Sequence, residues 1–125
     1  MSYTFGIWQH TDGDSLLLDD IQSLFDGAWS DEQPLSPTIE SLIEAVQSKF
    51  PDDEHSTCVW DSMPLTEQGR GTTFYPGVRL NFGDETLEAV FDCLYIESGI
   101  RGLYLIDWQT EKIYSPDEFQ PEENP

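Results

Sequence analysis

Hydrophobic residues along the chain follow two spacings, one typical of strands and one typical of helices. The run Tyr3–Trp8 is aromatic and β-branched and predicts a strand, and His10–Asp14 predicts a turn. Asp14 then offers an N-cap for a helix that we expect to end near Phe25. The apolar residues of this stretch recur at helical spacing: Leu17, Ile21, Leu24, Phe25 and Ala28.

Two further stretches predict helices by the same spacing. Ser36 caps the second helix, Pro37 occupies its first position, where proline is tolerated, and Pro51 ends it. Asp84 caps the third helix, and we expect Gly99 to provide the turn at its end. The predicted buried stripes of the two helices are Ile39, Leu42, Ile43, Val46 and Phe50, and Leu87, Val90, Phe91, Leu94 and Tyr95.

The remaining apolar segments predict strands at Thr57–Trp60, Thr73–Phe82, Leu103–Asp107 and, more briefly, around Lys112–Tyr114. Pro76 and Gly77 lie inside the second of these and predict a bulge or an edge position, because proline cannot donate a hydrogen bond to a neighbouring strand. The stretch 61–72 is polar and contains two glycines, so we interpret it as a loop.

The order of these elements predicts an α+β fold. Counting the first two helices as one unit gives βαββαβ, the split-βαβ or ferredoxin-like order. We expect one mainly antiparallel sheet of about four to five strands, with about three helices packed on one face and an acidic, aromatic surface on the other. The 125 residues fit a single domain. We assign this domain to residues 1–116 and expect the acidic tail 117–125 to fray.

Charge narrows the range of functions more than any other property. The chain has 25 acidic and five basic residues, for a net charge of −20. The net charge of a small soluble domain usually has a magnitude of roughly 2–8. Such a surface repels nucleic acid and anionic membranes, and it attracts and steers a basic protein. Colloidal solubility is the alternative explanation. Self-repulsion at this charge predicts a monomer or a weak dimer.

The cysteines and the N-terminal stretch bear on the cellular compartment. Cys58 and Cys93 lack the spacing of a CxxC pair, and Cys93 lies on an apolar helix face, where we expect a buried thiol. The first residues lack the basic and apolar regions of a signal peptide, and no window approaches the ~18 apolar residues of a membrane span. We therefore expect a cytoplasmic protein.

The segment FPDDEHSTCVW, residues 50–60, gathers side chains that bind metals or move protons. A structural zinc site needs four nitrogen or sulfur ligands, and here His55 and Cys58 form a half-site without an evident second half. The same two residues are a poor basis for a nucleophile and its base, because such pairs are usually assembled from distant segments. We predict no catalytic residue, no metal site and no cofactor, and we leave open a loose divalent-cation site at the adjacent carboxylates.

Those carboxylates, Asp52, Asp53 and Glu54, follow the C-terminal end of the second predicted helix. That end is partially negative, so each carboxylate there costs about 0.3–1 kcal/mol at low salt, of which Lys49 offsets a part. A cluster that opposes its own helix fits contact with a basic partner better than stability, unless Pro51 turns the chain away from the helix end.

Three segments together resemble a family of small bacterial proteins encoded near polymorphic-toxin genes: SYTFGIW (residues 2–8), KFPDDEHSTCVWDSMPL (residues 49–65) and GLYLIDWQTEKIYSP (residues 102–116). The family's closing turn usually reads Asp-Pro-Gln, where this chain has Trp108 in place of the proline, and Val59 precedes Trp60 here. Members are taken to be immunity proteins or have no assigned function. The resemblance therefore implies a toxin inhibitor and transfers no catalytic residue.

The leading hypothesis is an immunity-type inhibitor that binds a basic cytotoxic effector, such as a nuclease toxin domain. Acidic clusters would steer the partner and tryptophans would anchor it, since tryptophan is enriched at binding hot spots. The predicted partner-binding residues are Asp31, Glu32, Asp52, Asp53, Glu54, Trp60, Asp61 and Trp108. Trp29 is a further anchor candidate, and core packing is the alternative for every tryptophan. The alternative functions are an acidic adaptor that mimics nucleic acid and a small metal-dependent enzyme.

Overall fold

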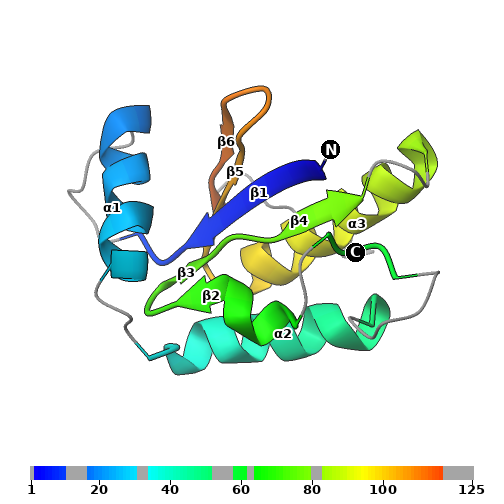
Figure 1. Cartoon of the computed structure of the whole chain (residues 1–125), viewed down its shortest axis with the longest axis horizontal. Coiled ribbons are helices and arrows are strands. Elements are labelled where there is room, and N and C mark those ends of the chain that lie inside the picture. The colour runs from blue at the N-terminus through cyan, green and yellow to red at the C-terminus, as the bar shows by residue number, and fades with distance from the viewer. Residues whose placement is uncertain are drawn as a thin grey trace, which may run out of the picture.

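A computed structural model describes residues 2–10, 17–30, 34–51, 58–61, 64–79 and 83–116. These residues form an α+β fold with three α-helices, a short 3₁₀ helix and one antiparallel sheet of six strands (Figure 1). The strands are β1 (Ser2–Trp8), β2 (Gly69–Arg70), β3 (Thr73–Phe74), β4 (Gly77–Arg79), β5 (Tyr104–Asp107) and β6 (Lys112–Tyr114). The helices are α1 (Leu18–Ser30), α2 (Pro37–Lys49), α3 (Asp84–Ile100) and the 3₁₀ helix η1 (Leu65–Gln68).

Strand β1 lies at the centre of the sheet. The strand order is β2-β3-β1-β5-β6, and β4 also pairs with β1. Every pairing of β1 is antiparallel. The predicted α+β class and antiparallel sheet are therefore confirmed, whereas the split-βαβ order is not, and the described residues contain more strands than the four to five expected.

The predicted long strand 73–82 is two short strands, β3 and β4, on either side of a proline. Ile7 lies opposite Phe74 and Thr4 lies opposite Gly77, so the same number of residues separates the two pairs on both strands and no residue is inserted. The predicted bulge is therefore absent at this point of the described chain. Pro76 interrupts the ladder because it has no N–H to donate, while its carbonyl oxygen still accepts from the Phe5 N–H at 3.0 Å.

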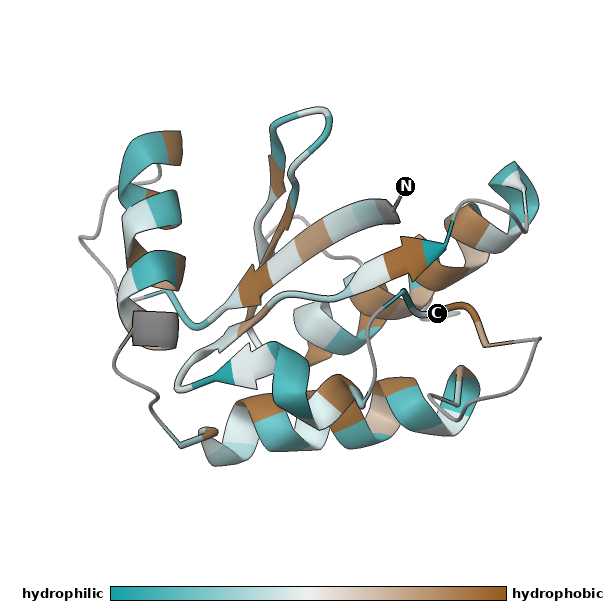
Figure 2. Cartoon of the chain, viewed as in Figure 1, coloured by the Kyte–Doolittle hydropathy of each residue, from teal (hydrophilic) through white to brown (hydrophobic). Residues whose placement is uncertain are grey.

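Alternation of side chains along β1 separates the core into two clusters, one on each face of the sheet. Phe5 and Ile7 belong to the larger cluster, which α2 and α3 cover. The hydrophobic positions of α2 lie on its side toward the sheet (Figure 2). Trp8 belongs to the smaller cluster, with Ile21 of α1 and Ile106 of β5. The expectation that all helices pack on one face is therefore wrong, since apolar residues on both faces of β1 and β5 each need a cover.

Helix α2 confirms the cap that the sequence predicts. The Ser36 hydroxyl oxygen accepts from the Ile39 N–H at 3.2 Å, and Pro37 is the first helical residue. The buried residues of the helix are Ile39, Leu42, Ile43 and Val46. Phe50, the last residue of the predicted stripe, caps the C-terminal end and is only partly buried. A local cap and a local stripe are enough to specify this helix.

Helix α3 starts and ends differently from the prediction. Asp84 is the first helical residue rather than the cap before it. At the other end Gly102, not Gly99, adopts the left-handed conformation, with φ of +72°. The N–H of Gly102 donates to the Gly99 carbonyl at 3.1 Å, and the N–H of Leu103 donates to the Ser98 carbonyl at 2.8 Å. This is a Schellman motif, in which glycine avoids the strain that a Cβ would bring.

A buried carboxylate joins α2 to α3. Glu97 is 9% exposed, and its carboxylate oxygens lie 3.0 Å from the Lys49 ammonium and 2.8 Å from the Arg101 guanidinium. Burial alone would raise the pKa of Glu97, but the hydrogen bonds from Lys49 and Arg101 outweigh it and lower the pKa. Arg101 also donates to the Ser41 hydroxyl at 3.2 Å. Two of the five cations of the chain therefore hold the fold together.

The remaining differences concern α1 and the segment after α2. Among the described residues α1 begins at Leu18 and runs to Ser30, past the predicted end, and Asp14 lies outside them. Leu17 and Leu24 of the predicted stripe are 69% and 40% exposed. The predicted loop 61–72 contains η1 and β2. Of the predicted strand 57–60, the described part forms only an isolated bridge, from Trp60 to Val78.

Gly6 of β1 lies directly beneath Phe25 of α1 and Trp108 of the turn after β5. A Cβ at this position would lie 2.8 Å from Trp108 Nε1, 3.0 Å from Phe25 Cζ and 3.0 Å from Ile106 Cγ2. By contrast, a Cβ at Gly27, within α1, would meet no atom within 4 Å. The absence of a side chain at Gly6 thus allows Trp108 and Phe25 to rest on the backbone of β1.

We predict opposite effects for alanine at these two glycines. Gly6→Ala should lower the free energy of unfolding by about 1–3 kcal/mol, because two rigid aromatic side chains must move. Gly27→Ala should raise it by up to about 1 kcal/mol, because alanine favours a helix and meets no neighbour. Urea unfolding of both variants measures the difference. An unchanged or raised stability of Gly6→Ala would contradict the close contact with Trp108.

Candidate functional site

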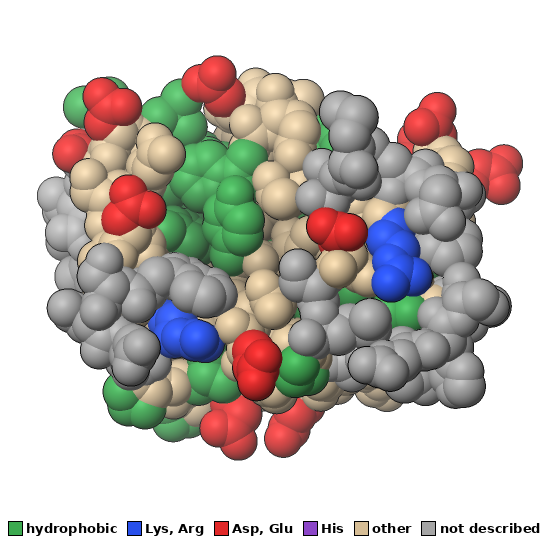
Figure 3. Space-filling model, in the orientation of Figure 1, with side chains coloured by type: hydrophobic (Ala, Val, Ile, Leu, Met, Phe, Trp, Pro, Cys, Tyr) green, Lys and Arg blue, Asp and Glu red, His purple; other side chains and the backbone are tan. Residues whose placement is uncertain are grey.

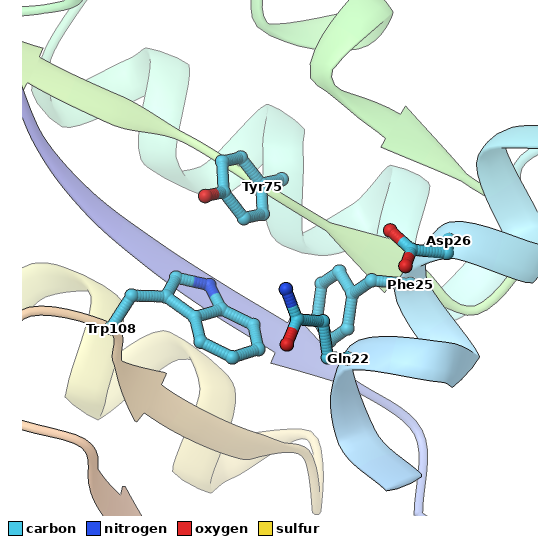
Figure 4. A pocket seen from close by; sticks show the side chains of 5 residues that line it. All are labelled: Gln22, Phe25, Asp26, Tyr75 and Trp108. Atoms are coloured by element: carbon cyan, nitrogen blue, oxygen red, sulfur yellow. The ribbon is translucent and has the colours of Figure 1, made fainter. Parts of the chain in front are cut away.

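A hollow in the described surface lies between α1 and the sheet. Its volume is about 480 Å³, within the usual range of ligand sites, and its lining residues are Gln22, Phe25, Asp26, Tyr75 and Trp108. We call it the aromatic hollow. Figure 4 shows the three rings on different sides of the space, with Gln22 and Asp26 reaching it from α1. The site therefore combines apolar walls with a few polar groups at its edge.

Three separate segments supply this lining. Gln22, Phe25 and Asp26 are three and four residues apart on α1, so they share one face of the helix. Tyr75 comes from the link between β3 and β4, and Trp108 comes from the turn between β5 and β6. Since β3 and β5 pair with opposite sides of β1, the strand brings these two rings together above it.

The three rings are in mutual contact. The centroid of Phe25 lies 5.6 Å from that of Trp108, with the rings at 85°, and 6.1 Å from that of Tyr75, with the rings at 68°. Tyr75 and Trp108 are 6.1 Å apart and tilted by 34°. Phe25 is 4% exposed, whereas Tyr75 is 37% exposed. Phe25 therefore forms the floor of the hollow, and Tyr75 offers its ring to solvent or to a bound group.

The turn that carries Trp108 is fixed to β1 by its two neighbours. One carboxylate oxygen of Asp107 accepts from the N–H groups of Gln109 and Thr110, at 3.0 and 3.2 Å. The Gln109 side chain accepts from the Thr4 N–H at 2.7 Å and donates to the Thr4 carbonyl at 2.7 Å. Trp108 lies between these anchored residues, so its ring position over Gly6 is set by the backbone of the turn.

The other oxygen of Asp107 accepts from the Tyr3 hydroxyl at 2.5 Å. Asp107 is 7% exposed, and this burial alone would raise its pKa. The hydrogen bonds from Tyr3, Gln109 and Thr110 stabilise the carboxylate more strongly, so the pKa of Asp107 is lowered. Burial, followed by the bond to Asp107, raises the pKa of Tyr3 to about 12. Tyr3 therefore stays protonated and Asp107 stays ionised at neutral pH.

The indole nitrogen of Trp108 is buried and has no hydrogen-bond partner among the residues that the structure describes. It faces Gly6, because a Cβ on Gly6 would lie 2.8 Å from it. An unpaired buried donor of this kind costs roughly 1–3 kcal/mol. The ring is thus held with its polar edge against the sheet, at a cost in stability.

Carboxylates lie along α1 beside the hollow. Asp26 at its edge is exposed, as are Asp19 and Asp20 in the first turn of α1. Figure 3 shows hydrophobic side chains gathered beside α1, with carboxylates along the helix next to them. The five cations of the chain make contacts within the fold. Lys49 and Arg101 pair with Glu97, and Lys112 lies over the Tyr114 ring. The other two donate to backbone carbonyls: Arg79 to that of Cys58, and Arg70 to those of Glu67 and Gly69. None of the five lining residues is cationic.

A smaller hollow of about 180 Å³ lies on the opposite face of the sheet. The ring residues Tyr3, Phe5, Phe91 and Tyr114 line it, with Leu87, Glu88 and Asp107. Its carboxylate from Asp107 already accepts hydrogen bonds from Tyr3, Gln109 and Thr110. The Asp107 carboxylate in this hollow is therefore already engaged in holding the Trp108 turn.

The structure places the predicted partner-binding residues in different surroundings. Trp108 lies in the aromatic hollow and Asp61 is exposed beside β4. Trp60 is fully buried, and its indole N–H donates to the Phe50 carbonyl at 2.7 Å, so the core-packing alternative describes this tryptophan. The other predicted residues, Asp31, Glu32, Asp52, Asp53 and Glu54, lie outside the described residues, as does the Trp29 side chain.

Sequence reasoning named Trp108 but missed most of its neighbours in the hollow. Phe25 was predicted only as a core residue, and Gln22, Asp26 and Tyr75 were not candidates. One signal was present: Gln22 and Asp26 follow the helical spacing that places them beside Phe25. Nothing local indicates that Tyr75 lies near Trp108, because β1 brings them together from positions far apart in the sequence.

The acidic segment that suggested metal chemistry is described only at its ends. Cys58 is buried, like Cys93, and the two are not joined by a disulfide. His55 lies outside the described residues. Within the described ranges, no group of three or more His, Cys, Asp or Glu side chains is arranged to hold a metal ion. Helices in those same ranges are too short or too polar to cross a membrane.

Comparisons with protein-family models, with curated proteins and with solved structures give no match.

We predict a pH-dependent loss of stability for Asp107→Asn. At neutral pH the variant should lose about 1–3 kcal/mol, because an ionised acceptor is replaced by a neutral one. Since the folded pKa of Asp107 is lowered, its stabilisation is complete above the ordinary aspartate pKa of ~3.9 and disappears as the pH falls through the folded value. The two proteins should therefore become equally stable in strong acid.

Urea unfolding at a series of pH values from neutral to acid measures this convergence. Asp92→Asn is the matched control, because it removes an exposed aspartate from α3 and should change stability by no more than about 0.5 kcal/mol. A difference between Asp107→Asn and the unmodified protein that stays constant at all pH values would show that the charge of Asp107 is not the stabilising feature.

Proposed function

We propose that this protein is an immunity-type inhibitor, which binds a basic cytotoxic effector protein and blocks its active surface. The observation that carries the proposal is the aromatic hollow, which opens among carboxylates on a chain of net charge −20. Exposed aromatic groups in a concave site are typical binding hot spots, and surrounding acids favour a basic partner. The resemblance of three segments, residues 2–8, 49–65 and 102–116, to toxin-associated proteins supports the same conclusion.

Binding, rather than catalysis, fits the residues of the hollow. Its lining offers one carboxylate, from Asp26, and one amide, from Gln22, beside three rings. A nucleophile and a general base held by a third group are the usual requirement for covalent catalysis, and these five residues do not include that combination. An aromatic ring held rigidly in a hollow, in contrast, loses little conformational entropy when a partner covers it.

The proposed mechanism has two stages. Long-range attraction between the acidic surface and a basic partner accelerates their encounter, by ~10- to 10³-fold for strongly steered pairs. The partner then covers the hollow, and burial of Trp108 and Tyr75 gives the complex its lifetime. Because a nuclease must bind a polyanion, an acidic inhibitor would occupy the surface that the substrate needs.

We predict that the protein binds the basic toxin domain encoded beside its own gene and rescues cells that express it. Trp108→Ala should weaken binding by at least about 2 kcal/mol, or ~30-fold, as expected for a hot spot. The association rate of the unmodified protein should fall by at least about tenfold between low and high salt. Calorimetry, stopped-flow kinetics and cell survival measure these three effects.

Ile100→Ala is the matched control. Ile100 is a large apolar residue that is 62% exposed on α3, outside the aromatic hollow, so its removal should leave both binding and rescue unchanged. Absence of binding to the toxin domain together with absence of rescue would overturn the proposed function. Equal losses for Ile100→Ala and Trp108→Ala would place the contact elsewhere on the surface.

A further inference from the structure

We propose that the aromatic hollow receives the guanidinium group of an arginine side chain from the basic partner. This inference rests on the proposed function for the identity of the partner, and on the geometry of the hollow for the identity of the group. It assigns a single side-chain chemistry to the site, where the proposed function assigns only a kind of protein.

The surroundings of the hollow first require a cation. Asp26 lies at its edge, and none of the described residues that line it carries a positive charge. The last turn of α1 also contains no basic residue, so the partial negative charge of that helix end is not offset within its own turn. Asp26 lies one turn before this end, so the negative potential of its carboxylate adds to that of the helix end. A group with positive charge is therefore favoured over a neutral apolar one.

The rings are the second requirement. A cation is attracted to the face of an aromatic ring when it lies within about 6 Å of the centroid. The centroids of Tyr75 and Trp108 are 6.1 Å apart and their rings are tilted by only 34°, so a single planar group can lie within that reach of both rings, above the buried Phe25. The arrangement resembles the aromatic cages that recognise organic cations.

Arginine fits this environment better than lysine. A guanidinium is planar and weakly hydrated, so it stacks on rings and leaves water more easily than a compact ammonium does. Its fork of N–H groups can donate in pairs to the Asp26 carboxylate, and the Gln22 amide oxygen offers a further acceptor. Figure 4 shows both side chains at the same opening as the rings. The hollow thus presents a stacking surface and acceptors together.

The test uses N-acetyl-arginine amide as the probe for the group itself. In ¹⁵N-labelled protein, the indole N–H signal of Trp108, assigned with Trp108→Phe, should shift and saturate at millimolar concentrations of the probe. N-acetyl-citrulline amide has nearly the same shape without the charge, and it should bind more than about fivefold more weakly. N-acetyl-lysine amide should also bind more weakly than the arginine compound.

Two charge variants separate the site from the general acidity of the surface. Asp26→Asn should weaken arginine binding by about two- to fivefold. Asp92→Asn, which removes another exposed aspartate, from α3, should leave it unchanged. Equal binding of arginine and citrulline compounds, no saturable shift of the Trp108 signal, or equal effects of the two variants would each overturn the guanidinium assignment.

Arginine substitutions in the toxin domain connect the site to the partner. One Arg→Lys change should weaken the complex, and its effect should shrink when it is combined with Asp26→Asn, as expected for two residues in contact. If the toxin domain binds but no arginine couples to Asp26, the proposed function stands and this inference fails. If the arginine compound binds the hollow but no toxin domain does, the guanidinium site stands and the proposed function fails.

Discussion

The alternation of side chains along β1 is the constraint on which the rest of the structure depends. The side chains of Phe5 and Ile7 point to the face covered by α2 and α3. The side chain of Trp8 points to the face covered by α1, as would a Cβ on Gly6. Because Gly6 has no side chain, the Trp108 and Phe25 rings rest directly on the strand. Any larger residue there would lift both rings and fill the space beneath the aromatic hollow. The same strand therefore organises the core and leaves room for the site.

In the turn after β5, neighbouring residues have different roles: some stabilise the fold and one lines the hollow. Asp107 and Gln109 bond to Tyr3 and Thr4 of β1 and attach the turn after β5 to that strand. Trp108, between them, projects to the other face and lines the hollow. Consecutive residues in extended backbone point to opposite faces of the sheet. The bonds of Asp107 and Gln109 to β1 therefore hold Trp108 in place without occupying the face on which its ring lies. The rigidity of the hollow is thus a consequence of how the sheet ends, and it limits the entropy lost when a partner binds.

Elements with complete local signals could be predicted from the sequence, and those set by distant contacts could not. Ser36 and Pro37 specify the start of α2 within their own turn. The face that α1 covers was mispredicted, because β1 and β5 are apolar on both sides and either face accepts an apolar helix. Gly99 and Gly102 both suit a helix end, and only the register of the last turn selects Gly102. Strand pairing places Tyr75 in the site, and the residues next to Tyr75 in the sequence do not indicate that pairing.

Several features that reduce stability coincide at the aromatic hollow. Within the described part of the chain, the Trp108 indole N–H is buried without a partner, Tyr75 is exposed to solvent, and Asp26 has no cation among the residues that line the site with it. The indole N–H faces the sheet, so a partner in the hollow would leave it unpaired. The stability lost at this donor is therefore the cost of holding the ring in position. The exposed ring and the carboxylate differ, because a stacked cation would satisfy both at once. Natural sequences depart from local optima mainly at functional sites, and this convergence of two features that one ligand would satisfy distinguishes the hollow from a merely imperfect surface.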